Sequence, residues 1–150
     1  MTHALSKLPE AARILLGLIF VVFGLNGFFG FLPQPPLPEA AVPFITGLAQ
    51  SGYFFPFLKG VEVTAGALLL ARAFVPLALT VLAPIIVNIA LFHLMLAPNL
   101  LMVALLVVLE LYLAWSYRDA FAPMLRRRTP MSVPRLTPSG GDYGSQPERA

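Results

Sequence analysis

The chain has 150 residues and a net charge of +3, and 58% of its residues are hydrophobic while only 11% are charged. Soluble domains carry about 25% charged residues, so this composition excludes an ordinary soluble domain, and we expect lipid to be the solvent. The absence of cysteine excludes disulfides, thiolate metal sites, iron–sulfur clusters and thiol redox chemistry.

Four mostly apolar stretches are suited to form helices that cross a bilayer, for which about 20 residues are needed. They cover residues 11–32, 56–74, 76–97 and 99–120, and prolines at 33, 56, 76 and 98 punctuate them. The last two connections are one or two residues long, which makes the helices they join antiparallel neighbours. The first stretch is longer than a signal-peptide core and lacks a cleavage site, so we expect it to be retained. The sequence predicts an all-α fold, an integral membrane four-helix bundle over residues 1–125.

The basic residues predict how these helices are oriented. Lys7 and Arg13 precede the first stretch or open it, Arg72 lies between the second and third, and Arg118 and residues 126–128 close the fourth or follow it. Four crossings place all of these on one side, and an excess of basic residues marks the cytoplasmic side. We therefore expect a multi-pass protein of the bacterial inner membrane with both termini cytoplasmic. This placement makes the basic residues topology signals, and we expect no nucleic-acid partner.

Residues 33–55 form the sizeable loop on the predicted outer side. After a proline-rich start, apolar residues between Glu39 and Gln50 recur at helical spacing, and Gly52 is placed to end a helix. We predict a short extracytoplasmic helix lying at the membrane surface, with an irregular loop as the alternative. At the other end of the chain, residues 126–150 are rich in Pro, Gly, Ser and Arg and predict a disordered cytoplasmic tail.

Amide and ionisable side chains inside apolar helices are costly, and by default they face the interior and serve a function. The candidates in the predicted spans are Asn26, Lys59, Glu62, Asn88, His93 and Glu110. At a rise of about 1.5 Å per residue, five of them fall in the outer half of their helices and Glu110 lies near mid-membrane. The four helices thus aim polar groups at a similar height, and we predict that these residues line a ligand-binding pocket.

Lys59 and Glu62 are three residues apart, so they share a helix face and we expect them to pair. One interpretation is a purely structural ion pair. The other is that Glu62 binds the polar head of a ligand or exchanges a proton. One turn further on, Gly66 allows a neighbouring helix to approach closely, and the glycines at 17, 24, 27 and 30 predict the same for the first helix.

The remaining polar candidates have simpler interpretations. The other histidine, His3, lies on the opposite side of the membrane from His93, which excludes a two-histidine haem site within the chain. We favour a hydrogen-bonded packing role for His93, and for Asn88 a role in satisfying a neighbouring backbone group. Glu110 would cost several kcal/mol as an unpartnered charge, so we expect it to be protonated or hydrogen-bonded.

Four motifs together point to a known family. They are RILLG from Arg13, GVEVTAG from Gly60, NIALFH from Asn88 and LELYLAWSYR from Leu109. With them the chain resembles the DoxX-like family of four-helix bacterial membrane proteins over residues 11–125. The resemblance implies a link to quinones, because the family is named for a subunit of a thiosulfate:quinone oxidoreductase. Many members carry a lysine near the end of the first helix, where this chain has Asn26.

We expect a non-catalytic accessory subunit, or a protein that binds a quinone or lipid through the polar cluster, and not an enzyme. No intrinsic cofactor is expected, and a quinone is the candidate that the resemblance supplies. The expected partners are the lipid bilayer and either a membrane or redox protein or further copies of the chain. Two alternatives remain: a membrane component of a quinone-linked oxidoreductase that takes electrons from another chain, and a small oligomeric transporter.

Overall fold

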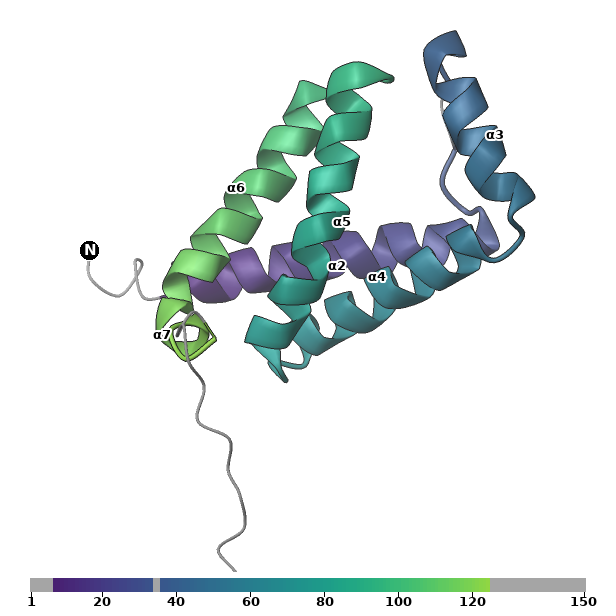
Figure 1. The fold of residues 1–150 in the computed structure, drawn as a ribbon. Coiled ribbons are helices and arrows are strands. Elements are labelled where there is room, and N and C mark those ends of the chain that lie inside the picture. Colours follow the sequence, from purple (N-terminus) through teal and green to yellow (C-terminus); the bar gives the residue numbers. More distant parts are fainter. Residues whose placement is uncertain (1–6, 34–35, 125–150) are drawn as a thin grey trace, which may run out of the picture.

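The structure is a computed structural model that describes residues 7–33 and 36–124, and within these ranges every regular element is a helix (Figure 1). The elements are α2 (Leu8–Phe29), the 3-10 turn η1 (Glu39–Ala41), α3 (Val42–Gln50), α4 (Phe54–Leu70), α5 (Val75–Met95), α6 (Leu100–Ser116) and α7 (Arg118–Phe121). The predicted all-α class is therefore confirmed for the described residues. The tail predicted over residues 126–150 lies outside them.

Length and composition make α2 and α5 able to cross a membrane. A third span is added if η1 and α3 are counted with α4, from which they are bent by 92°, as one broken span. Helix α6 is apolar but has only 17 residues, or about 26 Å at about 1.5 Å per residue, against a hydrocarbon core of about 30 Å. Residues 7–33 and 36–124 thus contain two or three candidate spans, and the predicted four are not confirmed.

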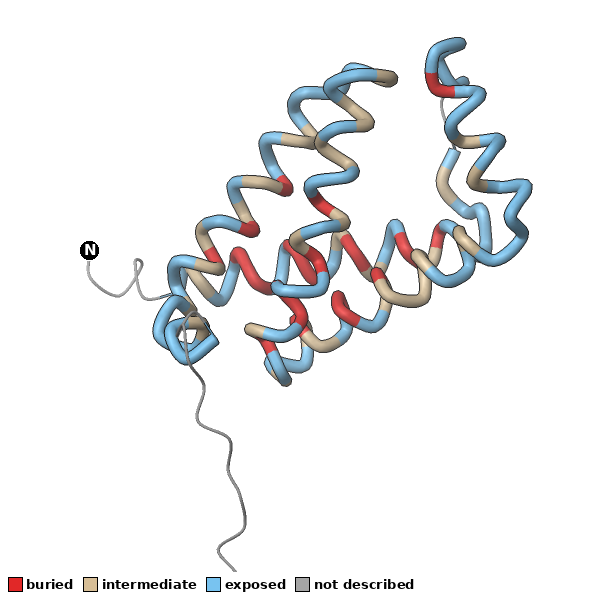
Figure 2. Tube along the Cα trace, in the orientation of Figure 1, coloured by how far each residue is buried: buried red, intermediate tan, exposed pale blue. Residues whose placement is uncertain are grey.

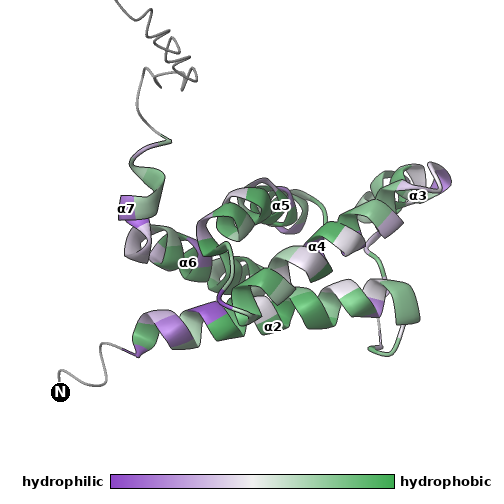
Figure 3. Ribbon diagram, turned by 90° about the horizontal axis from the view of Figure 1, so that it is seen from below, coloured by the Kyte–Doolittle hydropathy of each residue, from purple (hydrophilic) through white to green (hydrophobic). Residues whose placement is uncertain are grey.

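The predicted fourth span ran to residue 120, but the helix breaks earlier. Helix α6 ends at Ser116, and the separate turn α7 begins at Arg118. The break coincides with the first charged residues after the apolar run, since Arg118 pairs with Asp119 at 4.0 Å and both side chains are exposed. Hydropathy follows the same division, with α6 largely apolar and α7 partly hydrophilic (Figure 3).

Helices α2 and α4 lie side by side and antiparallel, and α5 and α6 form a second antiparallel pair that crosses the first (Figures 1 and 3). Buried residues gather where the two pairs cross, and the far ends of α5 and α6 are exposed (Figure 2). The fully buried side chains are leucines from α2, α4, α5 and α6: Leu16, Leu69, Leu79, Leu82, Leu106 and Leu113. This crossing differs from the parallel alignment expected of a four-helix bundle.

The seam between α2 and α4 is closed by glycines, as predicted. A Cβ on Gly66 would lie 2.9 Å from the Gly17 carbonyl oxygen, and a Cβ on Gly24 would lie 2.7 Å from a Val63 methyl. Neither helix could come so close with larger side chains at these positions. The prediction was wrong for Gly30, which has open space around it and a φ of +61°. Its left-handed conformation ends α2.

The carbonyl groups of the last three residues of α4 all accept hydrogen bonds. The amide of Arg72 (φ 56°) bonds to the carbonyl of Leu69 and that of Ala73 to Leu68, at 3.2 and 3.0 Å, which is a Schellman arrangement. The Arg13 side chain, buried at 4% exposure, also donates to Leu69 and, at 3.2 Å, to the carbonyl of Leu70. Sequence reasoning treated Arg13 only as a topology signal; its guanidinium also binds the negative end of the α4 dipole.

The segment between α2 and α4 is helical over Glu39–Gln50, as predicted, so the irregular-loop alternative is wrong. Gly52, with a φ of +74°, follows its end. The Phe44 ring of α3 lies against the Phe92 ring of α5, with ring centroids 5.9 Å apart. The location of α3 at the outer face of a membrane stays a prediction.

Candidate functional site

A buried ion pair lies near the start of α4. The Lys59 Nζ donates to Glu62 Oε2 at 2.8 Å, which confirms the predicted pairing. The Glu62 side chain is 4% exposed and that of Lys59 is 25% exposed. Glu62 is held inside the structure, therefore, while the lysine stem runs outward past Gly27, whose missing side chain leaves room for it.

Asn26 lies near the end of α2, the helix that packs against α4. Its side chain is buried, and its Oδ1 accepts a hydrogen bond from the Leu32 amide at 2.6 Å. Its backbone carbonyl accepts from the Gly30 amide at 2.8 Å. Asn26 thus fixes the turn that follows α2 through its oxygen atoms, and its Nδ2 group keeps two N–H donors that neither bond uses.

A cavity of about 330 Å³ opens between these groups and is lined by Phe23, Asn26, Gly27, Gly30 and Lys59. Its volume lies within the range of small-molecule sites, about 300–1,000 Å³. Two of its lining residues keep N–H donors that their printed bonds do not use, because Asn26 bonds only through oxygen and Lys59 uses one ammonium N–H for Glu62 and has two left. The carboxylate cancels the lysine charge, so this wall offers hydrogen-bond donors without a net charge. We call this cavity the polar pocket.

The other predicted site residues do not join the polar pocket. Asn88 is exposed on α5, its side chain has no hydrogen bond within the described residues, and it lines apolar grooves beside Phe54 and Phe44. Its predicted bond to a neighbouring backbone group is therefore wrong. His93 is half-buried and its Nδ1 donates to the Ala97 carbonyl at 2.8 Å, which confirms that the side chain is hydrogen-bonded.

Glu110 also stands apart from the polar pocket. It is buried at 7% exposure, and its Oε2 atom has no hydrogen-bond partner within the part of the chain that the structure describes. The predicted ring of polar groups at one height is therefore not formed. The reason lies in the crossing of the two helix pairs, because equal depth along helices that cross does not bring their residues together.

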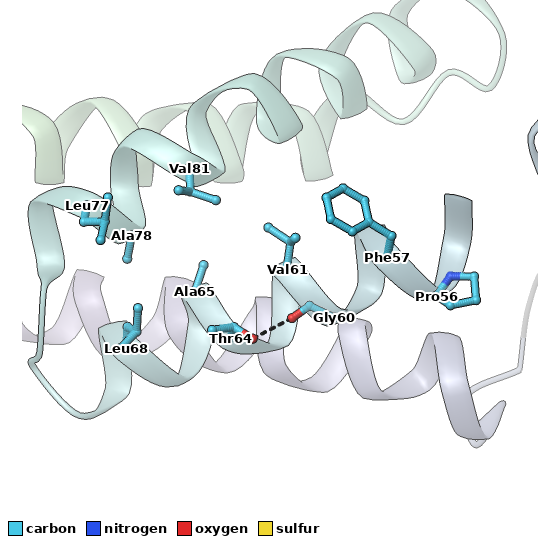
Figure 4. A pocket seen from close by; sticks show the side chains of 10 residues that line it. All are labelled: Pro56, Phe57, Gly60, Val61, Thr64, Ala65, Leu68, Leu77, Ala78 and Val81. Carbon is cyan, nitrogen blue, oxygen red and sulfur yellow. Dashed lines mark hydrogen bonds between the residues drawn. The ribbon is translucent and has the colours of Figure 1, made fainter. Parts of the chain in front are cut away.

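A second groove, larger than the polar pocket, was missed by sequence reasoning (Figure 4). It lies between α4 and α5, has a volume of about 500 Å³, and is lined by apolar side chains such as Phe57, Val61 and Val81. Its one side-chain hydroxyl, on Thr64, donates to the Gly60 carbonyl at 2.8 Å, so the groove presents no free donor there. Small residues facing each other on α4 and α5 are the signal that would have revealed it.

Within residues 7–33 and 36–124, no group of three His, Asp or Glu side chains could hold a metal ion. The described residues form a small, helical, apolar fold in which two or three helices are long and apolar enough to span a membrane, with a partly buried ion pair beside a ligand-sized cavity. A comparison of the chain with protein-family models, with curated proteins and with solved structures gives no match. The likeness to the DoxX-like family rests on the sequence motifs.

Proposed function

We propose that the chain is an integral membrane protein of the DoxX-like kind that binds a quinone in the polar pocket and acts as a non-catalytic accessory subunit. The observation that carries the proposal is the uncharged set of donors at the pocket wall, formed by Asn26 and the Lys59–Glu62 pair. A quinone presents carbonyl oxygens, which accept hydrogen bonds and carry no charge. The pocket and this head group are therefore complementary.

Charge distinguishes a quinone from a phospholipid in this pocket. A phosphate group carries a negative charge and favours cationic sites, where Arg or Lys is not neutralised. Here the ammonium of Lys59 lies 2.8 Å from a carboxylate that is almost fully buried, so it offers little net attraction to an anion. A neutral acceptor loses nothing by this pairing. The quinone is therefore the better of the two ligands that the sequence suggested.

Purification in mild detergent, followed by solvent extraction and chromatography, measures the quinone bound per protein. The wild type should carry a quinone, and N26L and K59M should each lose most of it, because each removes donors from the pocket wall. N88A is the matched control, since Asn88 is an exposed polar residue on a different helix. Equal quinone content in all four proteins, or a phospholipid in place of the quinone, would contradict the proposal.

The proposal includes four crossings of the bacterial inner membrane, with α3 on the outer face and both termini in the cytoplasm. A short helix such as α6 can be accommodated by local thinning of the bilayer. The basic residues around the predicted turns support this orientation. The full-length chain contains no cysteine, so single cysteines can report topology without background.

In intact cells with a permeabilised outer membrane, S51C should react with a membrane-impermeant maleimide and S132C should react only after the inner membrane is opened. Ser51 lies just after α3 and its hydroxyl is exposed, and residue 132 belongs to the predicted cytoplasmic tail. Reaction of both positions in closed cells, or of S132C alone, would refute the orientation.

A further inference from the structure

Glu110 belongs to the packed face of α6. One turn before it lies Leu106 and three residues after it Leu113, and the three are 7% exposed or less. This face meets α2 and α5 at the centre of the crossing. The Glu110 side chain therefore lies on the buried, apolar face of α6, and its Oε2 atom has no hydrogen-bond partner within the described ranges.

The ionisable groups on α2 and α5, which pack against α6, and on α4, which packs against α2 and α5, are already engaged. On α2, Arg13 donates to two carbonyls at the end of α4 and lies 3.7 Å from Glu10. On α4, Lys59 is paired with Glu62. On α5, His93 donates to the Ala97 carbonyl. None of these groups pairs with Glu110 in the described part of the chain.

An ionised carboxylate left alone in such a core costs several kcal/mol, whereas the neutral acid avoids most of that cost. Glu62 and Glu110 are both buried, but only Glu62 has a cation beside it. Their surroundings therefore favour opposite forms of the same side chain. Glu62 is suited to be a carboxylate, and Glu110 is suited to be a carboxylic acid.

We propose that Glu110 is a proton-binding site, separate from the polar pocket, whose carboxyl group is neutral in the folded chain at neutral pH and exchanges its proton with solvent. Its ligand is a proton, since within the described residues no group of three His, Asp or Glu side chains could hold a metal ion. The site does not depend on the quinone. It makes the crossing of the two helix pairs the place where the fold can take up or release one proton.

Infrared spectroscopy of the protein in micelles of a detergent without carbonyl groups, at neutral pH, tests this proposal, because a protonated carboxyl has a carbonyl-stretch band apart from those of carboxylates and amides. The wild type should show this band, and transfer into D2O should shift it as the proton exchanges. E110Q should remove the band and E62Q should keep it. E110L serves in place of E110Q if that variant does not fold, since both remove the acid.

The result that overturns the proposal does not need a variant. A wild-type spectrum at neutral pH without the protonated-carboxyl band would show that Glu110 is ionised. A band that survives in folded E110Q or E110L would belong to another residue, and a band that does not shift in D2O would exclude exchange. Each of these outcomes leaves the quinone measurement, and with it the proposed function, unaffected.

Discussion

Replacing Arg13 with methionine should destabilise the chain more than the loss of any surface charge. The Arg13 guanidinium is almost fully buried and donates to the carbonyls of Leu69 and Leu70 at the end of α4. Methionine fills a similar volume but donates nothing. The Leu69 carbonyl would keep its bond from the Arg72 amide, whereas the Leu70 carbonyl would lose its donor.

The size of the effect follows from these bonds. A buried carbonyl without a partner costs about 1–3 kcal/mol, and loss of a cation from a helix C-terminus adds up to about 2 kcal/mol in a partly buried setting. The ion pair with Glu10 adds little, because it is 3.7 Å long and the Glu10 side chain is 56% exposed. We therefore expect R13M to lower the free energy of unfolding by about 2–4 kcal/mol.

Circular dichroism during unfolding in mixed micelles measures this free energy for each variant. R13K should lose about half as much as R13M, because one ammonium replaces a planar fork that reaches two carbonyls. K7M is the matched control, since Lys7 is an exposed basic residue at the start of the same helix. If R13M and K7M lose equal stability, Arg13 acts only through its charge and the hydrogen-bonding argument is refuted.

Three further predictions concern the glycines and the ion pair, with unfolding in mixed micelles as the common measurement. G66A should cost about 1–3 kcal/mol because its methyl would collide with the facing helix backbone, whereas G60A, with open space around it, should be neutral or stabilising; equal losses would refute the tight seam. G30A should cost about 1 kcal/mol because its φ is +61°, and an unchanged stability would mean that the turn relaxes. E62Q should cost about 1–3 kcal/mol by leaving Lys59 without its carboxylate and should also lower quinone content; wild-type values for both would remove the pair from the site.

The features predicted correctly from the sequence are local ones. Apolar runs bounded by proline and glycine identified the helices to within a few residues, because a helix is set by its own neighbours. The Lys59–Glu62 pair followed from a spacing of three on one helix. The close contact at Gly17 and Gly66 was predicted because the main role of glycine in an apolar helix is to let a neighbouring helix approach closely.

The features that the sequence did not predict depend on how distant helices meet. We estimated how deep each polar residue lies along its own helix and assumed that residues at equal depth would meet in an aligned bundle. Because the two helix pairs cross, Asn88 and Glu110 lie away from the polar pocket. Arg13 was assigned to membrane orientation because a basic residue near a helix start is explained by that role alone. Its hydrogen bonds to Leu69 and Leu70 come from a helix more than fifty positions away, which no local pattern encodes.

At Arg72, in the turn between α4 and α5, the backbone conformation favours glycine whereas the predicted membrane orientation favours a basic residue. Arg72 occupies a left-handed backbone conformation, with a φ of 56°, at the position where glycine is usual. A residue with a side chain is less stable there by about 1–2 kcal/mol. Glycine at position 72 would relieve the strain in this turn but would also delete the one basic residue between α4 and α5. R72G should therefore raise the free energy of unfolding and, if the proposed membrane orientation holds, weaken the preference for that orientation.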